Sequence, residues 1–338
     1  MYPRIVEFGT IDLLGQSVPL IIYSYVVMIV LGFLSVWYGL KRELLRKGHS
    51  SKLAGRTTFW AFVAGFFGAN VYYLIEFGGA DSAKGPVFYV GLIGGVSVSV
   101  LVTLIKAKSN SRIRGKLDLF TKLVFWAGWI SSLVSFSIIT SDSKLTGGFV
   151  FYGGLIGGIV AVLVIIVRAK EPVWSIIDSI GPLLLLGYGI GRIGCFLAGD
   201  GCYGRPGDAP WCVTFPEAIA PIFHYQDQLY CVTTEVPNGT PDGAILTTVH
   251  PTPIYETILS FLSFGLLWRV RLQLEQRIGV LFGLALLSMG VARFIIEFWR
   301  INIKYLWDLL SGAQLISLAL IAFGLLIVGY RWSKTPSS

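Results

Sequence analysis

The chain contains nine apolar stretches, each of about the 20 residues that an α-helix needs to cross the hydrocarbon core of a membrane. They cover residues 19–40, 57–77, 87–105, 119–139, 149–167, 173–197, 253–270, 279–299 and 309–330. Only 14% of the 338 residues are charged, whereas a soluble domain carries about 25%. The sequence therefore predicts an all-α polytopic integral membrane protein of about nine transmembrane helices, which form one transmembrane domain over residues 1–338.

Basic residues gather in alternate loops between these stretches. The loops after the first, third, fifth and seventh stretches and the C-terminal tail carry most of them: Lys41, Arg42, Arg46, Lys47, Lys52, Arg56, Lys106, Lys108, Arg112, Arg114, Lys116, Arg168, Lys170, Arg269, Arg271, Arg277, Arg331 and Lys334. Because cytoplasmic loops are enriched in lysine and arginine, we expect the N-terminus outside and the C-terminus in the cytoplasm. The longest loop, 198–250, is then extracytoplasmic. Confinement of the basic residues to short loops argues against nucleic-acid binding.

A nine-residue motif occurs twice, as VFYVGLIGG at 87–95 and as VFYGGLIGG at 150–158. Self-similarity of this kind indicates an internal repeat. We therefore interpret 57–108 and 119–170 as tandem helix hairpins that enter the membrane from the same side.

The glycines of this motif have two interpretations. Small residues four apart allow two membrane helices to approach closely, which would be a packing role. Alternatively, they let Tyr152 and exposed backbone N–H groups approach a ligand. The second copy is the better candidate for binding, because Gly153 and Gly154 follow its tyrosine whereas Val90 replaces the first of these glycines in the other copy.

Two arginines lie in apolar surroundings. Arg192 is at the outer end of 173–197, and Arg293 is in the outer half of 279–299. Inserting an arginine near a bilayer centre costs about 2.5–3.5 kcal/mol, so a retained one usually lines a polar cavity. Both arginines are expected near the same leaflet. Together they suggest an anionic ligand, which in a membrane is most naturally a phospholipid headgroup.

The cysteines point to the outer side of the membrane. Cys202, Cys212 and Cys231 lie in the long outer loop, and Cys195 lies at its edge. An outward loop fits an oxidising compartment, where Cys212 with Cys231 is the preferred disulfide; the alternative is that all four are unpaired small apolar residues. Neither a Cys-x-x-Cys pair nor a His/Cys ligand spacing is present, so no metal is expected.

Several segments expected on the outer side together resemble a known family. They include GRIGCF at 191–196, HPTPIYE at 250–256 and GVARFIIEFWR at 290–300. In composition and order they are similar to patterns of the bacterial prolipoprotein diacylglyceryl transferase family, of the form Gly-Arg-x-Gly-Asn-Phe, His-Pro-x-Gln-Leu-Tyr-Glu and Gly-x-x-Arg-Phe-x-x-Glu-x-x-Arg. The resemblance extends from Tyr25 in the first helix to Gln314 in the last.

The resemblance implies an enzyme that moves the diacylglyceryl group of phosphatidylglycerol to the lipobox cysteine thiol of a prelipoprotein and releases glycerol phosphate. It implies a multi-pass protein of the bacterial inner membrane that uses no cofactor. Its partners would be phosphatidylglycerol, prelipoprotein signal peptides and the surrounding membrane lipids, with no nucleic acid.

Site residues follow from the same resemblance and from the chemistry of the side chains. Arginine pairs bidentately with phosphate, and neutralising the phosphate stabilises the leaving group. The residues expected to bind phosphatidylglycerol are Arg192, Arg293, Tyr25, Gly153, Gly154, Tyr255 and Gly194. The expected catalytic residues are Tyr152, Asp200, Glu256 and Arg293. Asp200 and Glu256 would act as a general base or would orient the arginines.

Structural alternatives exist for the charged residues. Arg192 could be an interfacial side chain held by Asp200, and Arg293 could pair with Glu297. Arg300 is interpreted as an ordinary flanking charge, and Asp178, towards the inner side, as a structural residue.

The chain also departs from the family pattern. Tyr152 stands where the family commonly has histidine, and a phenol with a pKa near 10 is a poorer base at neutral pH. Cys195 replaces an asparagine, Asp200 stands for a glutamate, and Pro253 replaces a glutamine. The additional hairpin makes nine helices in place of seven. These departures leave two alternatives open: a paralogue with another acceptor, or a catalytically silent lipid-binding membrane protein.

Overall fold

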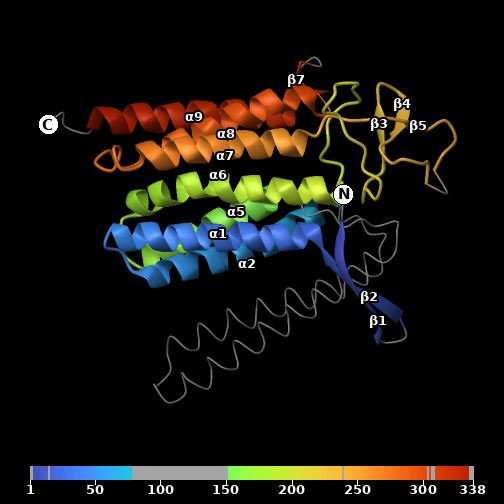
Figure 1. The fold of residues 1–338 in the computed structure, drawn as a ribbon. Coiled ribbons are helices and arrows are strands. Elements are labelled where there is room, and N and C mark those ends of the chain that lie inside the picture. The colour runs from blue at the N-terminus through green and yellow to red at the C-terminus, as the bar shows by residue number, and fades with distance from the viewer. Residues whose placement is uncertain are drawn as a thin grey trace. The chain divides into compact units, whose positions relative to one another are not determined.

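The computed structural model describes residues 3–13, 16–77, 151–237, 240–302, 304–305 and 309–334 (Figure 1). The helices expected at 87–105 and 119–139 lie outside these residues, as does much of both tandem hairpins. The duplication therefore stays a prediction, and the described residues test the other expected helices.

Two compact units make up the chain. The first contains Met1–Phe8, Ile21–Phe62 and Ile159–Ser338, and the second contains Gly9–Leu20 and Val63–Gly158. Arg192, Arg293 and the long loop belong to the first unit, so the candidate site can be described within it.

Each described α-helix coincides with one of the expected apolar stretches. The helices are α1 (Ser24–Arg46), α2 (Ser51–Phe77), α5 (Phe151–Arg168), α6 (Val173–Ala198), α7 (Thr252–Val270), α8 (Val280–Ile296) and α9 (Gly312–Lys334). Among the described residues, four helical segments are long and apolar enough to cross a membrane: Ser24–Arg46, Val173–Ala198, Val280–Trp299 and Gly312–Lys334. The described chain is therefore a mostly helical protein with membrane-length helices.

The described residues also contain short strands, so the fold is mostly helical and the all-α prediction is too strict. β1 (Arg4–Leu13) pairs with β2 (Gln16–Tyr23) in a two-stranded sheet. The helix expected at 19–40 is consequently wrong at its start, because α1 begins only at Ser24. A short apolar run rich in β-branched residues fits a strand as well as a helix, which explains the error.

The segment between α6 and α7 folds into a small structure of its own. It contains β3 (Ile222–Tyr225) and β4 (Gln228–Cys231), which form an antiparallel hairpin, and β5 (Ile245–Leu246), which pairs with β4. A second short hairpin joins β6 (Lys304–Tyr305) to β7 (Leu310–Ser311). The core of the segment between α6 and α7 consists of four buried side chains: Tyr203, Phe215, Val232 and Val249.

Residues 204 and 205 tie this segment to two helix ends. The Gly204 N–H donates to the His250 carbonyl at 2.8 Å, just before α7, and the Arg205 N–H donates to the Trp299 carbonyl at 2.8 Å, just after α8. The His250 N–H returns a bond to the Arg205 carbonyl at 3.2 Å. A short stretch of backbone therefore joins the segment between α6 and α7 to the ends of α7 and α8.

Helix α6 lies centrally in the first unit. It packs against α1, α7 and α8, and α8 packs in turn against α7 and α9 (Figure 1). Glycines allow the closest of these approaches. A Cβ atom added at Gly324 on α9 would lie 2.8 Å from the carbonyl oxygen of Gly283 on α8, closer than a real Cβ can come. Small residues of this kind let the backbones of membrane helices come into contact.

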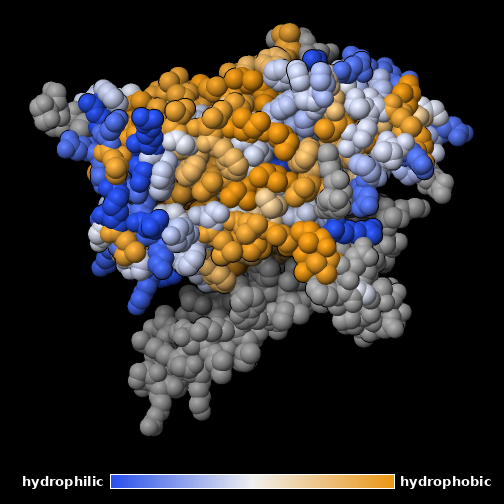
Figure 2. Space-filling view, in the orientation of Figure 1, coloured by the Kyte–Doolittle hydropathy of each residue, from blue (hydrophilic) through white to orange (hydrophobic). Residues whose placement is uncertain are grey.

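Apolar side chains cover the outside of these helices. Leu266 on α7 and Leu326 on α9 are 67% and 69% exposed. Figure 2 shows hydrophobic residues along the helices, with hydrophilic residues gathered at the end where the C-terminus lies and around the β3–β5 segment. Exposed apolar area of this extent suits a lipid environment.

The connections α1–α2, α5–α6 and α7–α8 meet in a polar network. Arg46 pairs with Glu43 and Glu275, both at 2.7 Å, and His49 pairs with Glu171 at 2.7 Å. Asp178 on α6 caps the start of α8, because its carboxylate accepts the Phe282 N–H at 2.7 Å and also the Gly279 N–H. The structural role expected for Asp178 is confirmed.

Within the second unit, α2 and α5 pack through glycines. A Cβ added at Gly154 would lie 3.1 Å from the Gly65 carbonyl oxygen. A Cβ at Gly157 would lie closer still to the Ala64 carbonyl oxygen, and so would a Cβ at Gly68 to the Gly153 carbonyl oxygen. The glycines of the 150–158 motif therefore pack against a neighbouring helix, which is the first of their two interpretations.

Candidate functional site

One buried glutamate gathers the arginines. Glu256, on the second turn of α7, has a side chain that is only 3% exposed. Its Oε2 atom accepts from Nε of Arg192, and its Oε1 atom accepts from Nη1 of Arg293 at 2.6 Å. The Tyr188 hydroxyl, one helical turn before Arg192 on α6, donates to Oε2 at 3.1 Å. Both oxygens of Glu256 are thus committed to neighbours from α6 and α8.

Two more charges complete the cluster at the end of α8. Arg293 also pairs with Glu297 at 2.9 Å, one turn later, and Arg300 lies 3.7 Å from Oε1 of Glu256. The interpretation of Arg300 as an ordinary flanking charge is therefore wrong. The reason is the short 3-10 turn Glu297–Trp299, which turns the chain back towards α7. Three guanidinium groups face two carboxylates here, which leaves excess positive charge beside an apolar helix bundle.

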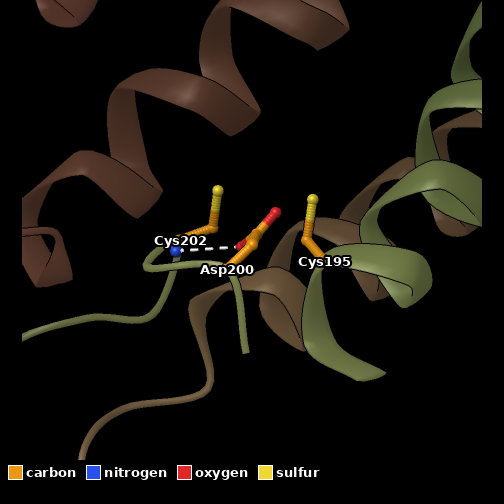
Figure 3. Close-up of side chains that lie close together, drawn as sticks. All are labelled: Cys195, Asp200 and Cys202. Carbon is orange, nitrogen blue, oxygen red and sulfur yellow. Dashed lines mark hydrogen bonds between the residues drawn. The ribbon is translucent and has the colours of Figure 1, made fainter. Parts of the chain in front are cut away.

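The end of α6 turns sharply and brings a second group of side chains to Arg192. Gly199 and Gly201 both have positive φ angles, 60° and 83°, which glycine adopts without steric cost. Between them, Asp200 accepts the Cys202 N–H at 3.1 Å. As a result the thiols of Cys195 and Cys202 and the carboxylate of Asp200 lie within 4.8 Å of one another (Figure 3).

Hydrogen bonds link this cysteine–aspartate cluster to the arginines. Nη1 of Arg192 lies 3.5 Å from Sγ of Cys195. The Cys202 carbonyl accepts from Nη1 of Arg300 at 3.2 Å and from the Thr252 hydroxyl at 2.7 Å. Arg192 therefore contacts both Glu256 and Cys195. It does not have Asp200 as its ion-pair partner, so that structural alternative is wrong.

Burial and neighbouring groups shift the pKa values of Asp200 and Cys202, which lie in the turn that follows α6. Burial, followed by the nearby Cys202, raises the pKa of Asp200 to about 6. The hydrogen bond from the Cys195 thiol lowers the pKa of Cys202, and the charges of Arg192 and Arg300 act in the same direction.

Other expected site residues fall in different places. A Cβ at Gly194 would lie 3.3 Å from Cα of Tyr25, so this glycine lets α6 approach α1 next to Arg192. The Tyr255 hydroxyl lies 3.1 Å from Nδ1 of His250. Tyr152, Gly153 and Gly154 belong to the second unit, and the side chain of Tyr152 lies outside the description. Their part in the site stays a prediction.

The expected disulfide between Cys212 and Cys231 does not form. All four cysteines are unbonded, and the fully buried Cys231 thiol lies 2.9 Å from the Thr233 hydroxyl. Sequence reasoning also missed the proximity of Cys195 and Cys202. Its only signal was Gly199-Asp200-Gly201, a pattern typical of a tight turn after a helix.

Comparison with known proteins adds to this geometry. The sequence model of a family described as prolipoprotein diacylglyceryl transferase matches residues 92–330, which is well over half of the chain. The chain belongs to this family. The match includes Arg192, Glu256, Arg293 and Arg300, so the resemblance expected from sequence is confirmed.

Individual relatives have the same description. The chain is 35% identical over 193 residues to the phosphatidylglycerol–prolipoprotein diacylglyceryl transferase of Actinobacillus pleuropneumoniae serotype 3, which covers 56% of this chain and 62% of that protein. It is 33% identical over 207 residues to the enzyme of that name from Clostridium tetani, which covers 61% of this chain and 72% of that protein. It is 34% identical over 185 residues to the one from Glaesserella parasuis, covering 54% and 59%. The chain thus spans about six tenths of the first of these relatives.

Proposed function

We propose that this protein transfers the diacylglyceryl group of phosphatidylglycerol to the lipobox cysteine thiol of a prelipoprotein and releases glycerol phosphate. Family membership and the names of the relatives support this reaction. The observation that carries it is the arrangement of Arg192, Arg293 and Arg300 around Glu256, at one end of a bundle of membrane-length helices.

The arginine cluster suits a phospholipid phosphate. Guanidinium groups offer several N–H donors in a plane and bind phosphate more specifically than an ammonium group does. Their charge stabilises the negative charge that develops on the leaving phosphate oxygen as the carbon–oxygen bond breaks. Apolar walls strengthen this effect, since water screens the interaction less there.

Glu256 serves in this proposal as the residue that orients the arginines. A general base has to offer a free oxygen to the proton that it removes. Both Glu256 oxygens accept from arginine side chains, and Tyr188 adds a further donor. Such partners stabilise the carboxylate and weaken it as a base. Tyr152 and Asp200 remain the candidates for handling the acceptor proton.

The same proposal includes an orientation and a location. With the N-terminus outside, the arginine cluster faces the outer leaflet of the bacterial inner membrane, where prelipoprotein signal peptides arrive. Two observations support this. The basic connections of the first unit meet at one end of its helices, and the Cys-containing segment lies next to the arginines.

Transfer can be measured directly with the purified chain in nanodiscs that contain phosphatidylglycerol. A prelipoprotein peptide with a lipobox cysteine should gain the mass of a diacylglyceryl group, and glycerol phosphate should be released in equal amount. We expect Arg192→Ala to lower the rate by about 10²–10³-fold, as loss of a transition-state donor does in other enzymes. Arg192→Lys should restore little, because lysine cannot bind the phosphate bidentately.

Arg168→Ala is the matched control. Arg168 lies in the last turn of α5, outside the arginine cluster, and its loss should leave the rate unchanged. If folded wild-type protein released glycerol phosphate without modifying the peptide, the acceptor would be a different molecule. If it released none, the proposed reaction would be wrong and a silent lipid-binding role would be favoured.

A further inference from the structure

The cysteine–aspartate cluster has the composition of a metal site. Cys195, Asp200 and Cys202 each offer one ligand atom, and all three atoms lie within 4.8 Å of one another. Figure 3 shows the Asp200 carboxylate between the two thiols, with both sulfur atoms pointing to the same side. Ligands from the end of a helix and from the turn that follows it therefore surround one common point.

The distances suit zinc. Zinc binds thiolate sulfur at about 2.3 Å and carboxylate oxygen at about 2.0–2.2 Å in a tetrahedral arrangement, which places two ligating atoms roughly 3.5–4 Å apart. The three ligand atoms need to move by less than about an ångström to reach that spacing. Two cysteines and one carboxylate fill three positions, and zinc sites that act on substrates keep the fourth position open.

Surrounding hydrogen bonds hold the three ligands in place. The Cys202 N–H binds one Asp200 oxygen and leaves the other available, and the Cys202 carbonyl is held by Thr252 and Arg300. Arg192 donates towards the Cys195 sulfur. Supporting partners of this kind fix ligand orientation in metal sites, and the arginines offset the negative charge of two thiolates and a carboxylate around a divalent ion.

We propose that Cys195, Asp200 and Cys202 bind a zinc ion whose fourth position takes the acceptor thiol as a thiolate. The role of the fourth position rests on the transfer reaction proposed above, whereas the metal site itself does not. Arg192 connects the two sites, because one guanidinium contacts both Glu256 and Cys195. A thiolate on the zinc would therefore lie next to the arginines that bind the lipid phosphate.

The step balances without an oxidant or reductant. Asp200, as a zinc ligand, does not act as the base here. The acceptor thiol loses its proton to water as its sulfur binds zinc, since zinc ligation requires the thiolate. The sulfur then forms a bond to the glyceryl carbon that carries the phosphate. The bond from that carbon to the phosphate oxygen breaks, and its electron pair leaves with glycerol phosphate. The neutral thioether product is a weak zinc ligand and departs.

Metal analysis tests the site without any measurement of activity. The 338-residue chain, purified in detergent without chelators, should contain one zinc ion per chain. Cobalt that replaces the zinc should give a thiolate-to-metal absorption band. Cys195→Ser and Cys202→Ser should each lower the zinc content by more than about tenfold, and Asp200→Asn should weaken binding. Cys212→Ser, which removes an unbonded cysteine outside the cluster, should change nothing.

The cobalt band is measured on the wild-type protein, so it tests the metal site even if the substituted variants fail to fold. Wild-type protein that binds neither zinc nor cobalt would overturn the proposal, and so would a disulfide between Cys195 and Cys202 in the isolated protein. Full transfer activity after removal of bound zinc would overturn the thiol-binding role and leave the transfer reaction intact. Zinc binding without transfer to any peptide would overturn the reaction and the thiol-binding role, and would leave the metal site standing.

Discussion

Glu256 forms ion pairs with three arginines of the candidate site, so one side chain affects the position of all three. It is almost fully buried and lies next to Arg192, Arg293 and Arg300. Removing one partner of a buried ion pair is costly because the remaining charge is left without compensation. Its burial among these arginines also lets this carboxylate hold their side chains in place for the phosphate ligand proposed above.

Replacement of Glu256 by glutamine should therefore destabilise the protein. The amide keeps the size of the side chain and removes the charge, so we expect a loss of about 3–5 kcal/mol in the free energy of unfolding. Tryptophan fluorescence during unfolding in detergent measures the change. Glu275→Gln is the control, since Glu275 also pairs with an arginine but its side chain is 41% exposed. Its loss should cost less than about 1 kcal/mol; equal effects would contradict the special role of Glu256.

At the residue scale, the two arginines could be predicted, as could Glu256 as a residue that orients them and Glu297 as a partner of Arg293. The contacts of Arg300 and Tyr188 with Glu256 could not. An arginine in an apolar stretch is visible in the sequence because it is costly there. Arg300 looked like any charge at the end of a helix, and Tyr188 like any tyrosine in a membrane helix. Their roles depend on how the chain turns after α8 and on which face of α6 packs against α7. The hydropathy pattern predicts neither of these.

Among the helices, α8 depends on its neighbour α6 for its first hydrogen bonds. The first N–H groups of a helix have no partner within it, and at α8 the Asp178 carboxylate accepts two of them. Asp178→Ala should therefore lower the free energy of unfolding by about 1–2 kcal/mol, as loss of a capping side chain does. Asp178→Asn should cost less, because its amide oxygen still accepts a bond. Unfolding in detergent measures both, and equal losses would argue against the cap.

The close contact between α8 and α9 can be tested with two glycine substitutions on α9. Gly324→Ala would push a Cβ atom to 2.8 Å from the Gly283 carbonyl oxygen and 2.9 Å from the Leu287 nitrogen. Both are backbone atoms, so the helices would have to separate, and overpacking typically costs about 1–3 kcal/mol. Gly329→Ala on the same helix meets nothing within 4 Å. It should be neutral or slightly stabilising, since alanine favours a helix more than glycine does. Thermal unfolding of the two variants compares them directly.

Helices were the most predictable elements of this chain. α6 and α7 begin and end within two residues of the expected 173–197 and 253–270, because polar residues interrupt the apolar runs at those points. The β1–β2 hairpin was missed, since a short apolar run does not distinguish a strand from the start of a helix. Strand pairing in the segment between α6 and α7 depends on contacts between residues far apart in sequence, which periodicity does not reveal.

For the whole molecule, charge distribution predicts how the protein sits in a membrane. We expect the C-terminus in the cytoplasm and the segment between α6 and α7 outside. Green fluorescent protein fused to the C-terminus should therefore fluoresce in bacterial cells. Alkaline phosphatase inserted at the exposed Asp242 should be active, because this enzyme folds only outside the cytoplasm. Activity of the phosphatase at the C-terminus would reverse the proposed orientation.

The backbone bonds at Gly204 and Arg205 have a mechanical consequence for such a molecule. Two of these bonds join residues 204 and 205 to His250, before α7, and the third joins Arg205 to Trp299, after α8. Separating the two helix ends therefore costs at least one such bond, or about 1 kcal/mol. A phospholipid has two bulky tails, which need a gap between helices in order to slide in sideways. For the phospholipid substrate proposed above, we therefore expect entry between other helices, because the ends of α7 and α8 that are joined through Gly204 and Arg205 resist separation.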